Sequence, residues 1–269
     1  MFKNARNNVI DIDDTTINYI SFGSGDKNLI IIPGLGDGIK TVDGIAIPFS
    51  VAYKEFAKDY KVYVISRRNK LKKGFSISNM ADDIAYIMNK LKIKSAAIAG
   101  VSQGGMIAQH IAIDYPKKVE KLVLIVTIPK INKIAKKNLK RWITYAYKKD
   151  YKNLLIDNLE SIYTEKTLRK YRKFYNTIVK ISDPKEYDRF IIEAHACLSH
   201  NAIHKIKKIE CPTLIIGAKQ DKVLGFEGSI KLHKKIKNSK LYLYEDYGHG
   251  VYEEAKDFNN RILEFLNEE

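Results

Sequence analysis

The sequence predicts a mostly parallel central β-sheet flanked by helices, with a helical cap inserted into it. Short runs rich in Ile and Val alternate with longer segments in which apolar residues recur at helical spacing, the pattern of a parallel sheet covered by helices. The alternation stops after residue 128 and resumes at about residue 208. We therefore expect an α/β core made of residues 1–128 and 208–269, and a cap made of residues 129–207.

The first half of the core begins with a predicted hairpin around the polar turn Asp13-Asp14. The helix predicted to begin at Gln103 is stopped by Pro116, because proline cannot continue a helix. Apolar patterning places strands at 9–12, 17–22, 29–32, 62–65, 95–99 and 122–126, and helices at 49–57, 80–91 and 103–115.

The second half of the core follows the cap. Strands are expected at 213–216 and 241–244, and helices at 226–236 and 253–266. Both strands are short apolar runs of the kind expected in a sheet that is covered on both faces.

The expected cap contains helical patterns and no convincing strand. It holds 19 Lys and Arg and 8 Asp and Glu, and so carries +11 of the total charge of +16. We expect its basic side chains to face solvent, and some of its aromatic side chains to pack on the core and line a largely apolar pocket. These aromatic residues are Trp142, Tyr145, Tyr147, Tyr151, Tyr163, Tyr171, Phe174 and Tyr175.

Composition argues against several classes of protein. The 269 residues, 45% of them hydrophobic and 29% charged, suit one large globular domain. No apolar run reaches the length of a membrane-spanning helix, and the N-terminus lacks the pattern of a signal peptide, so we expect a cytoplasmic protein. The basic residues are mostly Lys and match no nucleic-acid-binding motif, so we expect no nucleic-acid partner.

No cofactor or metal site is expected. Cys197 and Cys211 lie in no CxxC pair, so we interpret them as reduced structural thiols. His200 and His204 are four residues apart but have no carboxylate or third ligand between them.

The strongest chemical signal is Gly100-Val101-Ser102-Gln103-Gly104. This GxSxG motif follows a predicted buried strand and opens a predicted helix, which is the context of a nucleophile elbow. The sharp turn exposes the serine hydroxyl, and glycines are needed because neighbouring backbone comes close. The alternative is a serine that only caps the helix.

A serine nucleophile needs a base, and the base needs an orienting acid. His249 lies between two glycines, directly after the last predicted strand, and Asp221 follows the strand before it. Both residues therefore lie at the carboxyl ends of predicted strands, which is where the active sites of parallel sheets are found. Of the other histidines, we expect His110 to be packed or at the surface and His233 to be solvated.

The developing oxyanion needs two backbone donors. The amide of Gln103, directly after the serine, is one candidate. The other comes from the loop after strand 29–32; Pro33 has no amide hydrogen, so Leu35 is the better candidate.

Together these segments resemble the α/β-hydrolase superfamily. The resemblance rests on residues 31–37, 99–105, 212–221 and 247–250, and covers nearly the whole chain outside the cap. It implies a Ser102–His249–Asp221 triad. The chain departs from the family in having Pro33-Gly34 where His-Gly is frequent; the backbone donor of that loop does not depend on this side chain. A second family position for the acid, after the sixth strand, holds no carboxylate here.

The function implied is hydrolysis of a carboxylic ester or a related small acyl substrate through an acyl-enzyme. With the same triad, cleavage of a C–C bond, a thioester or an N-terminal peptide bond is an alternative. A third reading is a binding protein of this fold without turnover.

Overall fold

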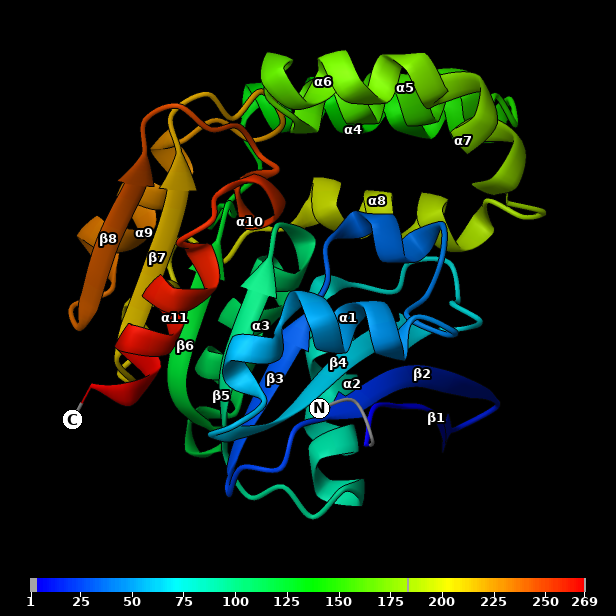
Figure 1. Ribbon diagram of the computed structural model, residues 1–269. Helices are drawn as coiled ribbons and strands as arrows, with labels where there is room; N and C mark the ends of the chain where they lie inside the picture. The colour runs from blue at the N-terminus through cyan, green and yellow to red at the C-terminus, as the bar shows by residue number, and fades with distance from the viewer. Residues whose placement is uncertain (1–3, 183, 269) are drawn as a thin grey trace.

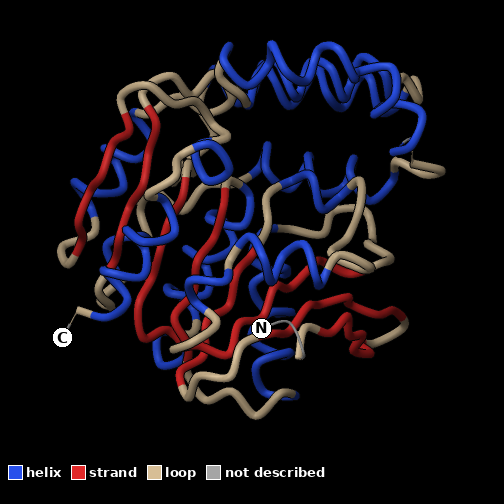
Figure 2. The backbone as a smooth tube through the Cα atoms, in the orientation of Figure 1, coloured by secondary structure: helices blue, strands red, loops and turns tan. Residues whose placement is uncertain are grey.

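A single eight-stranded sheet organises the chain in the computed structural model, which describes residues 4–182 and 184–268 (Figures 1 and 2). The strand order is β1-β2-β4-β3-β5-β6-β7-β8. The strands are β1 (Arg6–Ile12), β2 (Thr15–Phe22), β3 (Lys27–Ile32), β4 (Tyr60–Arg68), β5 (Ala96–Val101), β6 (Val119–Ile125), β7 (Thr213–Ala218) and β8 (Ser239–Tyr244).

The sheet is mostly parallel, as the sequence predicts. β1 and β2 form the expected antiparallel hairpin, β2 pairs antiparallel with β4, and all remaining pairs are parallel. Parallel strands with helices on both faces are apolar along their whole length. In β3 this is visible directly, because Ile30 and Ile32 pack into one core cluster while Leu29 and Ile31 pack into the other.

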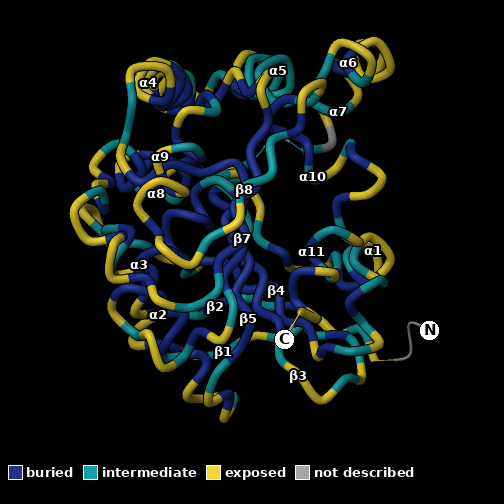
Figure 3. Tube along the Cα trace, turned by 90° about the vertical axis from the view of Figure 1, so that its left-hand side faces the viewer, coloured by how far each residue is buried: buried dark blue, intermediate teal, exposed yellow. Residues whose placement is uncertain are grey.

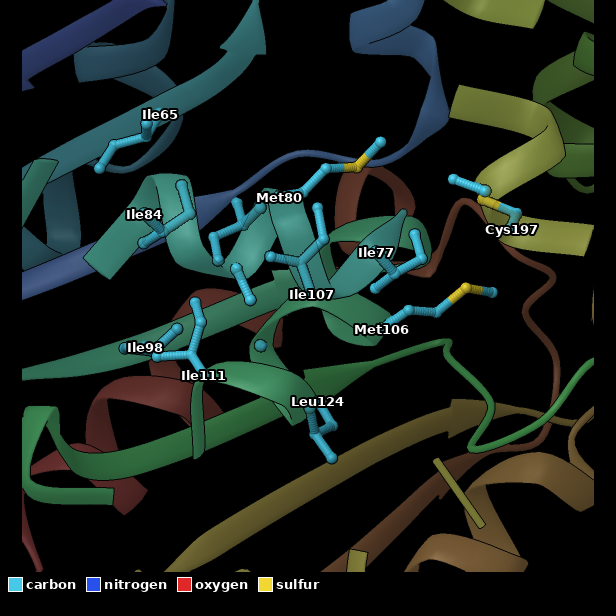
Figure 4. Close-up of a cluster of buried hydrophobic side chains, with 14 of the residues drawn as sticks. Ile65, Ile77, Met80, Ile84, Ile98, Met106, Ile107, Ile111, Leu124 and Cys197 are labelled. Carbon is cyan, nitrogen blue, oxygen red and sulfur yellow. The ribbon is translucent and has the colours of Figure 1, made fainter. Parts of the chain in front are cut away.

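The helices of the core lie on both faces of the sheet (Figure 1). α2 (Ile77–Lys90), α3 (Gln103–Asp114) and α9 (Glu227–Lys235) contribute to one buried cluster, part of which is drawn in Figure 4. α1 (Ala46–Ala52), the 3₁₀ turn η2 (Lys54–Phe56) and α11 (Phe258–Asn267) contribute to the other. The short segments η1 (Leu35–Gly38), η3 (Pro116–Lys118) and α10 (Val251–Glu254) follow β3, α3 and the loop after β8.

Between β6 and β7 the described chain is helical and lies beyond the carboxyl ends of the parallel strands (Figure 1). Its elements are α4 (Lys133–Tyr147), α5 (Tyr151–Ile162), α6 (Glu165–Tyr171), η4 (Arg172–Phe174), α7 (Tyr175–Ser182), α8 (Asp188–Ser199) and η5 (Ile206–Lys208). We call residues 129–207 the cap region.

The lysines of the cap region face outward, whereas Arg189 and Glu193 of α8 are largely or fully buried. All 15 of its lysines are exposed, as the sequence analysis expects, and Figure 3 shows exposed positions along α4, α5 and α6. Among its aromatic residues, Trp142, Tyr151 and Tyr175 are buried, whereas Tyr147, Tyr171 and Phe174 are exposed. Tyr145 and Tyr163 are half-buried.

Two predicted helices differ most from the structure in their extent. The helix expected at 49–57 begins earlier, at Ala46, because Pro48 fits the first turn of a helix. It ends at Ala52, and a 3₁₀ turn then brings Phe56 into the core at 1% exposure.

The helix expected at 253–266 is split into α10 and α11. Ala255 adopts an extended conformation between them, with φ −85° and ψ 120°. The hydroxyl of Tyr244 donates to Asp257 Oδ1 over 3.1 Å at the bend. The break lets α10 follow the His249 loop while α11 packs on the sheet.

No helix among the described residues is both long and apolar enough to cross a membrane.

Candidate active site

Ser102 lies at the tight turn between β5 and α3. Its backbone has φ 53° and ψ −113°, a conformation that L-residues rarely adopt. The side chain makes no capping hydrogen bond to α3, which argues against the reading as a simple helix cap. The turn therefore holds Ser102 in a strained conformation of the kind found at functional sites.

The glycines around Ser102 are required by space. A Cβ on Gly104 would stand 2.0 Å from the carbonyl oxygen of Ile32, and a Cβ on Gly100 would stand 2.3 Å from the carbonyl oxygen of Gly104. Both distances are far below van der Waals contact. Strand β3, the turn and α3 approach one another so closely that only glycine fits.

The end of β6 supports the same turn. Val126 has φ 40°, an outlier for a β-branched residue, and it follows Ile125, whose carbonyl accepts the Ser102 amide over 2.9 Å. The hydroxyl of Thr127 donates to the carbonyl oxygen of Ser102 over 2.7 Å. Backbone strain therefore occurs at two neighbouring strand ends.

His249 and Asp221 form a buried pair. His249 Nδ1 lies 2.8 Å from Asp221 Oδ2, and the two residues are 3% and 7% exposed. The other carboxylate oxygen, Oδ1, accepts the amides of Val223 and Leu224 over 2.7 and 2.9 Å. An ionised carboxylate only accepts, so Nδ1 carries the proton and Nε2 is left as a basic nitrogen.

The glycines beside His249 leave room for residues of the cap region, and they are not needed for a turn of the backbone. Neither has a positive φ in the structure. Instead, the Gly250 amide donates to the carbonyl oxygen of Ile162 over 2.8 Å, and a Cβ on Gly250 would meet the Tyr163 ring at 2.9 Å. A Cβ on Gly248 would stand 3.0 Å from the Ile162 oxygen. The histidine loop therefore lies directly under α5.

Ser102, His249 and Leu35 line one cavity of about 320 Å³ between the core and the cap region. In the described chain, Ser102 and His249 are not hydrogen-bonded to each other; in free enzymes such a contact often tightens only with substrate. Apolar side chains form much of the wall: Ile31, Pro33, Val42, Ile45, Phe49, Val101, Trp142, Ile162 and Val223.

The wall also contains polar groups that the sequence analysis did not identify: Lys40, Tyr53, Asn158, Tyr252 and Glu253. Burial raises the pKa of the Tyr53 and Tyr252 hydroxyls, so both stay protonated and can donate hydrogen bonds. Proximity to His249 in sequence was a signal for Tyr252 and Glu253. No local pattern pointed to Tyr53 or Asn158, which other elements bring to the cavity.

The two expected oxyanion donors are unpaired. Within the described residues, neither the Leu35 nor the Gln103 amide donates to another group of the protein. Leu35 begins η1 and Gln103 begins α3, and the first amides of a helix have no partner inside it.

The other histidines and the two cysteines considered in the sequence analysis do not line this cavity. His110 and His200 are buried near each other, with ring centroids 5.7 Å apart, whereas His204 and His233 are exposed. Cys197 and Cys211 are free thiols. The described residues contain no group of three or more His, Cys, Asp or Glu side chains arranged to hold a metal ion.

Comparisons with known proteins show the family to which the chain belongs. The chain is similar to the AB hydrolase superfamily protein YisY of Bacillus subtilis, at 28% identity over 206 residues, which cover 72% of this chain and 75% of that protein. It is also similar to the human serine hydrolase BPHL, at 22% identity over 278 residues, covering 96% and 85% of the two chains.

Among solved structures, the chain is similar to MGS-M2, an alpha/beta hydrolase enzyme from a Medee basin deep-sea metagenome library. The TM-score is 0.86 at 21% identity, with 97% and 98% of the two chains covered. The family described as alpha/beta hydrolase fold matches residues 27–256. This chain therefore belongs to the alpha/beta hydrolase fold family.

Proposed function

We propose that this chain is a serine hydrolase that cleaves a carboxylic ester or a related small acyl substrate. One observation carries the proposal: His249, which is hydrogen-bonded to Asp221, and the strained Ser102 line the same cavity. Two relatives of the chain, BPHL and the bifunctional esterase/perhydrolase DCH of Acinetobacter calcoaceticus, are named as a serine hydrolase and an esterase.

In the proposed mechanism, His249 Nε2 removes the proton from Ser102 as its oxygen attacks the substrate carbonyl. Asp221 holds the imidazole in the required tautomer and stabilises the imidazolium that forms. The Leu35 and Gln103 amides bind the oxyanion of the tetrahedral intermediate. Protonation of the leaving group by His249 gives an acyl-enzyme, which water activated by His249 then hydrolyses.

The cavity favours a neutral substrate of modest size. Its volume of about 320 Å³ is at the lower end for small-molecule pockets, and its wall is largely apolar. The 15 lysines of the cap region are exposed and remain hydrated, so they do not supply a site for a strongly anionic acyl group.

A panel of p-nitrophenyl esters of increasing acyl length tests this function. We expect hydrolysis to be fastest for short acyl groups and to decline for long ones, and to disappear in Ser102→Ala. Thioester, amide and C–C bond substrates should be assayed beside the esters, because the same triad serves those reactions. Cleavage of one of those bonds with no ester hydrolysis would replace the ester assignment.

A further inference from the structure

Four charged side chains, three of them buried and one largely buried, lie beside the proposed oxyanion hole. Arg67, at the end of β4, is 2% exposed, Asp37 in η1 is 4% exposed, and Glu193 in α8 is fully buried. Arg189, also in α8, completes the group with a side chain 13% exposed. Removing charges from water costs free energy even when the charges are paired, so a buried cluster of this size suggests a role beyond stability.

Arg67 directs its guanidinium at the backbone of the oxyanion loop. Its Nη1 donates to the carbonyl oxygen of Pro33 over 2.9 Å, and its Nη2 donates to the carbonyl oxygen of Gly34. The loop lies against the nucleophile, because a Cβ on Gly34 would be 3.5 Å from Ser102 Cβ. One side chain thus holds two consecutive carbonyl groups next to the reacting serine.

This contact sets the direction of the Leu35 amide. The Gly34 carbonyl and the Leu35 N–H belong to one peptide unit, and the described chain has no cis peptide bond. In a planar trans peptide the two groups point in opposite directions. By holding the Gly34 oxygen, Arg67 fixes the Leu35 N–H so that it points away from the guanidinium.

The second donor is connected to the same guanidinium. Arg67 Nη2 also donates to Gln103 Oε1 over 2.7 Å. The other end of that side chain, Gln103 Nε2, donates to the carbonyl oxygen of Glu193 over 3.1 Å and contacts Cys197 Sγ at 3.3 Å. The residue whose backbone amide is the second expected donor is therefore held between Arg67 and α8.

The carboxylates keep Arg67 in place. Arg67 Nε donates to Glu193 Oε2 over 3.3 Å, and the Arg67 amide donates to Asp37 Oδ2 over 3.1 Å. Burial works against the charged form of Asp37, but Arg67 and Arg189 outweigh it and hold the pKa of Asp37 below its usual value. Arg189 also contacts Asp37, so α8 of the cap region contributes two of the four charges.

We propose that Arg67 is a positioning residue that aims both amides of the oxyanion hole, and that Glu193 of α8 holds Arg67 in position. The proposal rests on the hydrolase function above. In it, the Arg67 side chain supports the oxyanion loop that begins with Pro33-Gly34. It also links the last helix of the cap region to catalysis without contact between that helix and the oxyanion.

The test is Arg67→Lys, which keeps the charge but cannot hold both carbonyls and Gln103 with one ammonium. For the best ester we expect kcat to fall by roughly 10²-fold, the order expected for loss of an oxyanion donor, with KM within about twofold. Affinity for an alkyl boronic acid should fall in parallel with kcat, because its tetrahedral adduct places an oxygen in the hole.

Arg68→Lys is the matched control. Arg68 is the next residue on β4 and forms an ion pair with Asp83, in which Arg68 Nη2 lies 2.6 Å from Asp83 Oδ1. Its side chain makes no hydrogen bond to the oxyanion loop. We expect its kcat to equal that of the wild type. A drop in thermal stability of Arg67→Lys with kcat and boronate affinity within about threefold of wild type would overturn the proposal, since it would leave only a structural role.

Gln103→Met is a second variant, for the case that Arg67→Lys does not fold, and it changes no charge in the buried cluster. It removes the side-chain link but keeps the backbone amide, so we expect kcat to fall about tenfold with KM unchanged; an unchanged kcat contradicts the proposal. Wild-type hydrolysis is measured in the same series. Its absence would reject the proposed function, whereas hydrolysis that is indifferent to these substitutions would reject only the role of Arg67.

Discussion

At the scale of single residues, the proposed chemistry depends on a few side chains that neighbouring backbone groups hold in place. Asp221 shows this most clearly, because one of its oxygens is occupied by two backbone amides and the other is left for His249. The carboxylate thus has a fixed orientation before any substrate binds.

Replacing Asp221 by Asn separates orientation from packing. The amide oxygen can still accept the Val223 and Leu224 amides, so we expect the fold and the melting temperature to change little. The amide nitrogen would face His249 Nδ1 and favour the wrong tautomer, and kcat should fall by roughly 10⁴-fold. The measurement is kcat and Tm for the best ester.

Asp82→Asn serves as the control, because Asp82 accepts the Tyr115 hydroxyl at 2.8 Å on the exposed side of α2. If Asp221→Asn keeps kcat within about tenfold of the control, another group orients the histidine.

The residues that could be predicted from sequence are those with a local signature. The glycines around Ser102 point to it as a candidate nucleophile, and the positions of His249 and Asp221 after predicted strands point to them as its candidate partners. Arg67 could not be found in this way, because its role depends on contacts with Pro33, Gln103 and Glu193, which are far apart in the chain.

At the scale of elements, the close approach of β3 to the start of α3 fixes the turn that carries Ser102. Gly104→Ala would place a Cβ 2.0 Å from the Ile32 oxygen, so the helix or the strand must move. We expect a loss of several degrees in Tm or failure to fold. Gly36→Ala is the control, since a Cβ there has nothing within 4 Å. Equal melting temperatures of the two variants would contradict the packing described here.

The end of α8 carries a buried histidine whose protonation opposes folding. Burial and the nearby His110 lower the pKa of His200 to about 3, and His200 Nε2 donates to the carbonyl oxygen of Ile128 over 3.2 Å. The unfolded chain has an ordinary histidine pKa of about 6.5, so it binds more protons than the folded chain below that value. The free energy of unfolding therefore decreases as pH falls from about 6.5 toward about 3.

His200→Gln tests this dependence, because its amide nitrogen can still donate to Ile128. Urea unfolding at several pH values below 6.5 should show a shallower loss of stability in the variant. The expected difference is at most about 1.4 kcal/mol per pH unit, the effect of one proton. Parallel curves for the two proteins would show that His200 is not kept neutral by the fold.

The strands could be predicted well and some helices less well. Buried strands in this sheet are covered on both faces, so an apolar run identifies them to within a few residues. The break between α10 and α11 could not be predicted, since no proline or glycine marks it in the sequence. The division into core and cap at residues 129–207 stays a prediction, although the chain there is helical.

At the scale of the whole molecule, the cap region carries +11 of the net charge of +16, and all of its lysines are exposed. Exposed charges act on a substrate only through solvent, where salt screens them. For a neutral ester we expect kcat/KM to change less than about twofold between about 0.01 and 1 M salt, although the Debye length shortens from about 30 to about 3 Å.

An acyl-CoA measured over the same salt range provides the comparison. Preference for the acyl-CoA at low salt that collapses at high salt would show that the lysines steer an anionic substrate, against the neutral-substrate proposal.

The most direct test of the central claim is labelling by a fluorophosphonate probe, which reacts with an activated serine, followed by identification of the modified residue by mass spectrometry. The account predicts a single covalent adduct on Ser102, lost in Ser102→Ala although that variant remains folded. A wild-type protein that is folded and yet unlabelled, or labelled on a different serine, would contradict it.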